Sequence, residues 1–93
     1  MTDRYDFGLG AHQARMNITW AGDNGDLVDA VPYDATDSEL KAIAIEAVGG
    51  GSVPGIPSTS ALDLDGFVVD RFPATEAVPY NRIFVRPKTP FGR

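Results

Sequence analysis

Few side chains in this sequence are of the types that catalyse reactions or bind metals. The chain has no cysteine and a single histidine, His12, so thiol catalysis, disulfides and zinc–thiolate sites are excluded. Asp63 and Asp65 fall on one face of an extended segment with Asp70 nearby, but no full ligand set at calcium-loop spacing accompanies them. We therefore predict a solvated acidic face, no metal site, no catalytic residue and a protein that is not an enzyme.

Charge and hydropathy argue against two further classes of partner. Eight lysines and arginines against thirteen acidic residues give a net charge of −5, which repels nucleic acid and anionic lipid. No run approaches the roughly 18 consecutive apolar residues of a membrane helix. The first residues also lack the basic segment followed by an apolar segment that is typical of a secretory signal. With 93 residues, we expect one small domain, monomeric and cytoplasmic.

The elements that position any functional residue follow from the hydropathy pattern. Met16 to Trp20 alternates apolar and polar side chains, which is typical of a half-buried strand. Residues 1–15 show no such period and predict a flexible N-terminal extension. The cluster from Gly22 to Asp26 contains an Asn-Gly pair that favours a hairpin turn, so a second strand is expected over Leu27 to Val31.

One helix is predicted from Asp37 to Val48. Thr36 and Glu39 have the spacing of a capping box, and Gly49 to Gly51 should end the helix. Apolar residues recur at helical spacing between these ends: Leu40, Ile43, Ala44, Ala47 and Val48. Ile45 lies beside this stripe and is either packed beneath a loop or exposed to a partner.

The segment after the helix is predicted to complete a sheet. Ser52 to Ser60 is an irregular loop, and short strands are expected over Leu62–Leu64 and Phe67–Val69. The last strand is Arg82 to Arg86. We expect an α+β fold in which residues 16–86 form one domain, followed by an extended tail over residues 87–93, because its prolines cannot join a sheet interior.

The last predicted strand divides its side chains between two faces. By the two-residue period, Ile83 and Val85 face the core, which leaves Arg82, Phe84 and Arg86 on the other face. This face suits the docking of acidic or apolar partners. Alternatively, the N-terminal extension or a loop covers Phe84.

The order and spacing of these elements resemble ubiquitin and the ubiquitin-like β-grasp family, in which one helix packs across a mixed sheet of four to five strands. The resemblance covers residues 16–92 and includes the hairpin, the helix, the Gly/Pro loop from Val53 to Pro57 and the final strand. Gly92 lies seven residues after Val85, as in the tails of ubiquitin-like modifiers. The chain most resembles the ubiquitin-like proteins of bacterial ubiquitination-type operons, which occur beside an activating enzyme, a conjugating enzyme and a processing peptidase.

The resemblance implies a protein modifier that is made as a precursor. Phe91-Gly92 replaces the usual double glycine and Arg93 follows it, so the peptidase would remove Arg93. The activating enzyme would then adenylate Gly92, using ATP and Mg²⁺ that this chain does not itself bind. The acyl group would finally be conjugated to target proteins, and Lys41 and Lys88 are the candidate acceptors if copies were joined into chains.

The tail has the reach and shape that such a role requires. Six residues, 87–92, span roughly 20 Å at about 3.3 Å each, and glycine has no Cβ to obstruct attack at its carbonyl. The enzymes are expected to recognise Pro87, Lys88, Pro90 and Phe91, with the prolines reducing the entropy lost on binding. The alternative is a frayed C-terminus.

Two other functions are compatible with these residues. A non-covalent β-grasp interaction module would dock through the face of Arg82, Phe84 and Arg86 and would not need the tail. A sulfur carrier would convert the terminal glycine into a thiocarboxylate, although the missing double glycine and the trailing Arg93 disfavour it.

Overall fold

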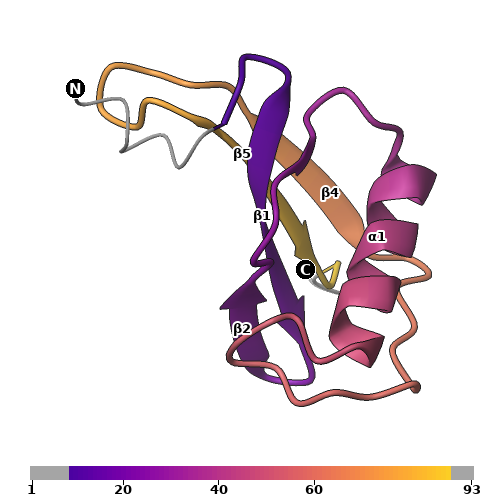
Figure 1. Ribbon diagram of the computed structural model, residues 1–93. Coiled ribbons are helices and arrows are strands. Elements are labelled where there is room, and N and C mark those ends of the chain that lie inside the picture. Colours follow the sequence, from indigo (N-terminus) through magenta and orange to yellow (C-terminus); the bar gives the residue numbers. More distant parts are fainter. Residues whose placement is uncertain (1–8, 89–93) are drawn as a thin grey trace.

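The sheet is built around two neighbouring strands from opposite ends of the chain. The computed structural model describes residues 9–88. Its elements are β1 (Gln13–Trp20), β2 (Asp23–Asp26), β3 (Val31–Pro32), α1 (Asp37–Gly49), β4 (Val68–Phe72) and β5 (Asn81–Arg86). The strand order is β2-β1-β5-β4, and β3 also pairs with β1. Helix α1 crosses one face of this mixed sheet (Figure 1), which confirms the predicted α+β class.

The core lies between α1 and the face of the sheet that α1 covers. Strands β1 and β5 pair in parallel, with Met16 opposite Ile83 and Ile18 opposite Val85, and these four side chains are fully buried. Each such aliphatic side chain contributes about 1.5–3 kcal/mol on burial. The other buried apolar residues are Ala14, Leu27, Val31, Leu40, Ala44, Val48, Val53, Ile56, Leu62 and Leu64.

Helix α1 begins as the sequence predicts. The Thr36 side chain accepts a hydrogen bond from the Glu39 amide at 3.1 Å, and the Glu39 carboxylate accepts one from the Thr36 amide at 2.9 Å. This capping box satisfies two donors at the helix start. The helix has 13 residues, and no helix within residues 9–88 has the length and hydropathy needed to cross a bilayer.

The end of α1 is a glycine turn. Gly51 has a φ of +74°, its amide donates to the Val48 carbonyl, and the Ser52 amide donates to the Ala47 carbonyl at 2.9 Å. These two bonds form a Schellman motif, which requires a left-handed residue that glycine adopts without strain. The glycine stop is therefore confirmed, with the helix one residue longer than predicted.

The first strand begins three residues earlier than the pattern indicated. Ala14 is fully buried and pairs with Val31 on one side and Asn81 on the other. The Asn81 side chain also donates hydrogen bonds to the carbonyls of Ala11 and Gln13. Residues 11–15 thus belong to the folded domain, because pairing with distant strands holds them, and residues 1–8 of the predicted extension lie outside the described residues.

The sequence predicted the hairpin turn at Asn24-Gly25, but this prediction is wrong. The turn between β1 and β2 lies at Ala21-Gly22. Both turn residues have positive φ, +52° and +87°, as a tight two-residue turn requires. Asn24 instead lies within β2, where its side chain bonds to Asn17 and Thr19 of β1. Gly25 is a strand residue whose absent Cβ allows close contact with Pro54.

Two further predicted strands are largely irregular. Of Leu27–Val31, only Val31 belongs to a strand, and Leu62–Leu64 forms none. Leu62 and Leu64 are nevertheless buried, so the alternation predicted their burial correctly but the strand wrongly. Leu62–Leu64 does not pair as a strand because it leads into a local turn, in which the Asp65 amide donates to the Asp63 carboxylate and the Phe67 amide donates to the Leu64 carbonyl.

The two glycines of the hairpin predict different costs of substitution. In Gly25→Ala the new Cβ would lie 2.2 Å from the Pro54 carbonyl oxygen, so we expect a loss of about 2–3 kcal/mol of unfolding free energy, the upper part of the range for overpacking. Gly22→Ala has free space around it and should lose only about 1 kcal/mol from its positive φ. Urea denaturation of both variants measures this order, and equal losses would contradict the close contact at Pro54.

Candidate functional site

The sheet face opposite α1 carries the polar and aromatic cluster predicted on the last strand. Ile83 and Val85 are fully buried, whereas Arg82 and Phe84 are half-buried and Arg86 is exposed. Register places side chains of the neighbouring strands on the same face. We call this surface the open face and define it by Arg15, Asn17, Asp70, Phe72, Arg82, Phe84 and Arg86.

The centre of the open face is an arginine against two aromatic rings. The rings of Phe72 and Phe84 meet edge to face, with centroids 5.5 Å apart. The guanidinium carbon of Arg82 lies 5.5 Å from the Phe72 centroid and 5.9 Å from that of Phe84. Phe72 remains 41% exposed. The cluster therefore offers a cation and an apolar ring at one point, through cation–π and ring–ring contacts.

The other arginines of β4 and β5 have carboxylate partners. Arg86 pairs with Asp70 across the two strands. Arg71, on the face toward the helix, lies 2.8 Å from the Asp37 carboxylate and donates to the Ala35 carbonyl. Of the predicted cluster, Arg82 is the residue held by rings rather than by an acid. The Nε atom of Arg82 is buried and has no hydrogen-bond partner among the described residues.

A small hollow of about 210 Å³ adjoins this cluster on the open face. Arg15, Asn17 and Asp26 border it from β1 and β2, and Arg82 and Phe84 border it from β5. Asn17 donates to the Asp26 carboxylate at 2.7 Å. Pockets for small molecules are usually about 300–1,000 Å³, so this hollow is better matched to a single side chain of a partner protein.

The aspartates weighed as metal ligands in the sequence, Asp63, Asp65 and Asp70, are exposed or half-buried and are not gathered in the structure. Asp70 is paired with Arg86 and Asp63 is used in a turn. Between residues 9 and 88 no three acids or histidines are grouped so that they could hold a metal ion. The carboxylate of Asp70 thus serves in an ion pair and that of Asp63 in a turn.

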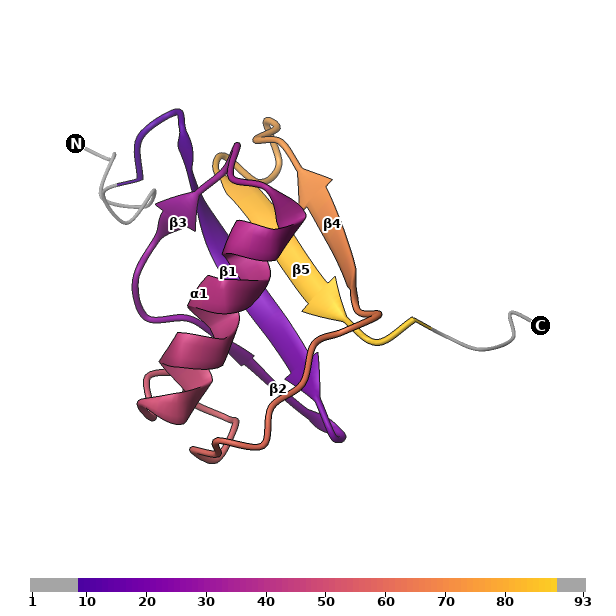
Figure 2. The ribbon, with the colours of Figure 1, turned by 90° about the vertical axis from the view of Figure 1, so that its right-hand side faces the viewer.

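The chain leaves the fold at the end of β5. Strand β5 is interior to the sheet, between β1 and β4, and after Arg86 the chain runs away from the sheet (Figure 2). Pro87 and Lys88 are exposed. The remaining predicted tail residues lie outside the described residues: Pro90, Phe91, Gly92 and Arg93. Of the two candidate acceptors, Lys88 is exposed and Lys41 is half-buried on α1.

Sequence reasoning missed the contribution of the neighbouring strands to the open face. Within residues 9–88, the ring that lies against Phe84 is that of Phe72, three residues beyond the predicted end of its strand. The segment from Val68 to Phe72 has no regular alternation of polar and apolar residues, so no local signal marked this extension. Arg15 was likewise assigned to the extension, although it continues the polar alternation of β1.

The comparisons with known proteins identify no relative. No protein-family model, curated protein or solved structure matches this chain. The open face and the exit of the chain after β5 are therefore the two features on which a functional proposal rests.

The contact between the rings of the open face predicts an energetic coupling. In a double-mutant cycle of Phe72→Ala and Phe84→Ala, we expect a coupling of about 0.5–1.5 kcal/mol, the range for edge-to-face pairs, measured by urea denaturation. Phe72→Ala with Val28→Ala is the matched control and should be additive within about 0.5 kcal/mol. A coupling of zero for the ring pair would show that the two side chains are independent.

Proposed function

We propose that this chain is a ubiquitin-like protein modifier with a β-grasp fold, most similar to those of bacterial ubiquitination-type operons. The carrying observation is the exit of the chain from β5: an interior strand ends at Arg86, and Pro87 and Lys88 are exposed. The sequence that carries Gly92 therefore starts outside the core. The hairpin, the single helix across the sheet and the parallel pair β1–β5 are compatible with the β-grasp.

The chemistry assigned to this chain is the presentation of a carboxylate. A peptidase hydrolyses the bond between Gly92 and Arg93, which leaves the Gly92 carboxylate at the end. An activating enzyme binds ATP and Mg²⁺, the carboxylate attacks the α-phosphorus, and pyrophosphate leaves. The acyl group then passes to a nucleophile of the target protein with loss of AMP. The chain itself needs no catalytic group, and glycine leaves its carbonyl unobstructed.

The open face supports the same proposal as the surface that the enzymes would recognise. Its Arg82–Phe72–Phe84 cluster combines an arginine with aromatic rings, residue types that are enriched at protein interfaces. The exit at Arg86 lies on the same strand as Arg82 and Phe84. One enzyme could thus contact the open face while the residues after Lys88 extend toward its active site.

The proposal predicts a specific covalent mark in the host cell. An N-terminally tagged chain should form higher-mass adducts that resist denaturation. Trypsin cleaves after lysine, so a target joined to Gly92 should retain the residues that follow Lys88, Thr-Pro-Phe-Gly, on its acceptor. Gly92→Ala should abolish the adducts. Mass spectrometry of the digested adducts identifies both the remnant and the acceptor residue.

Two controls separate the tail from the folded domain. Thr89→Ala should keep the adducts and change the remnant to Ala-Pro-Phe-Gly. A chain that ends at Gly92 should conjugate without the peptidase. Thermal unfolding of Gly92→Ala should match that of the parent chain. Adducts that persist in a folded Gly92→Ala variant would refute activation at Gly92.

A second candidate function is favoured by the exposed Phe72 ring beside Arg82. In a non-covalent interaction module, this cluster alone would bind the partner. A chain that ends at Pro90 would then keep its affinity for a partner identified by cross-linking, and Arg82→Ala would lose about tenfold or more. Under the modifier proposal, the truncated chain forms no adduct, whatever its affinity.

A further inference from the structure

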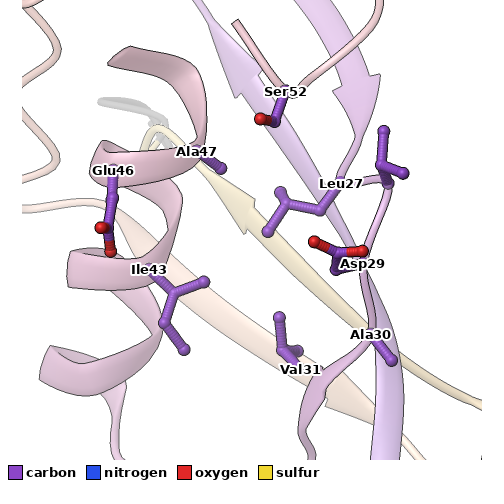
Figure 3. Close-up of a pocket in the computed structure, with 9 residues that line it drawn as sticks. Leu27, Asp29, Ala30, Val31, Ile43, Glu46, Ala47 and Ser52 are labelled. Atoms are coloured by element: carbon purple, nitrogen blue, oxygen red, sulfur yellow. The ribbon is translucent and has the colours of Figure 1, made fainter. Parts of the chain in front are cut away.

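A groove on the opposite side of the molecule has a different chemistry from the open face. It runs between α1 and residues 27–35, and we call it the helix groove. A hollow of about 240 Å³ lies between Leu27, Val31 and the helix residues Ile43 and Ala47. Figure 3 shows that the side chains of Leu27 and Ile43 approach each other from its two walls. A second, more open hollow of about 550 Å³ shares Ile43 and continues toward Ala35.

The floor of the helix groove is apolar and incompletely covered. Leu27 and Val31 are buried, whereas Ile43 and Ala47 are half-buried. These two helix residues belong to the apolar stripe of α1 but lie at the side that the sheet does not fully cover. Val28, in the wall that residues 27–35 form opposite α1, is 62% exposed. An apolar side chain from outside would therefore find contacts here that water does not provide.

The rim of the helix groove carries only one sign of charge. Four acids line its two hollows, and neither hollow is lined by lysine or arginine: Asp29, Asp34, Glu39 and Glu46. Glu39 also caps the helix. The side chains of Asp29 and Glu46 form no ion pair and no hydrogen bond with any other group in residues 9–88. An occupant with positive charge would thus meet carboxylates that no other described residue engages.

The cations of the described chain are placed elsewhere. Arg71 and Arg86 pair with acids, and Arg15 and Arg82 lie on the open face. Lys41 is two residues from Ile43, about 200° around the helix, and so projects away from the groove. Lys88 follows β5 and borders neither hollow. No lysine or arginine among residues 9–88 therefore lines this rim, and the charge of the rim is complementary to that of a basic partner.

We infer that the helix groove binds an extended segment of a partner protein in which an apolar side chain is flanked by lysines or arginines. The helix rises about 12 Å from Glu39 to Ala47, which four extended residues span. The smaller hollow is below the size of typical small-molecule pockets and suits one aliphatic side chain. The carboxylates are strung along the rim rather than gathered as a metal site within residues 9–88. The inference does not depend on Gly92 or on conjugation.

Selection from a random peptide library tests the chemistry of the occupant. Phage that display peptides of about seven residues, the length needed to span the groove with both flanks, are panned on the full chain. The selected peptides should combine an aliphatic residue with neighbouring lysines or arginines. Amide NMR titration with the selected peptides should shift the signals of residues 27–35 and 39–47, and binding should weaken as salt is raised.

Charge-neutral variants test the role of the rim with matched controls. Asp29→Asn together with Glu46→Gln should weaken the selected peptides by about three- to tenfold, as expected for two exposed ion pairs. Asp65→Asn with Glu76→Gln changes the net charge equally at exposed positions outside the groove and should leave the affinity unchanged. Val28→Asn should weaken binding without changing its dependence on salt. Thermal unfolding of each variant verifies its fold.

Several results would overturn the inference. These are a failure to select any peptide, selection of acidic or uncharged peptides, and shifts confined to the open face. Equal weakening by the control pair would show that net charge, rather than the groove, attracts the peptide. Self-association of the chain that both Arg82→Gln and Asp29→Asn abolish would make a second copy the occupant. Loss of adducts in Gly92→Ala has no bearing on any of these outcomes.

Discussion

The parallel pairing of β1 with β5 is the constraint on which the rest of the structure depends. It joins the two ends of the described chain and buries Met16 and Ile18 beside Ile83 and Val85. Because side chains alternate along a strand, a slip of one residue would move this whole set to the solvent side. The same register that closes the core therefore places Arg82 and Phe84 on the open face and brings β5 to its end at the surface.

The single helix creates two surfaces of unlike chemistry by covering only one face of a small sheet. Leu40, Ala44 and Val48 fill the interface with the sheet, which leaves Ile43 at the margin, where the helix groove forms. The face that has no helix must be stabilised by its own side chains, and there Phe72, Phe84 and Arg82 pack on one another. One surface is cationic and aromatic and the other is acidic and aliphatic, so partners of opposite charge suit them.

Predictions from local sequence patterns were wrong where contacts with distant segments decided the local structure. Asn24-Gly25 has the composition of a turn, but the absent Cβ of Gly25 serves a close contact with Pro54, a residue far along the chain. Leu62 and Leu64 alternate as a strand does, yet they reach the core from a turn. Ala14 and Arg15 continue the alternation of β1, but the short side chain of Ala14 is a weak apolar signal, and the partners that hold both residues in the sheet are remote in sequence. Such cases need knowledge of what packs nearby.

The sequence by itself determined the helix with its cap and glycine stop, the buried face of the last strand, and the α+β class, because these follow from hydrogen bonds and periodicities within a few residues. Only the tertiary structure decided the bounds of β1, the turn between β1 and β2, the meeting of Phe72 with Phe84 and the helix groove. These depend on contacts between segments far apart in the chain, whose register no local period specifies. The residue proposed to be conjugated, Gly92, and the face of Arg82, Phe84 and Arg86 were indicated by the sequence, whereas the contribution of Phe72 to that face and the helix groove were visible only in the folded structure.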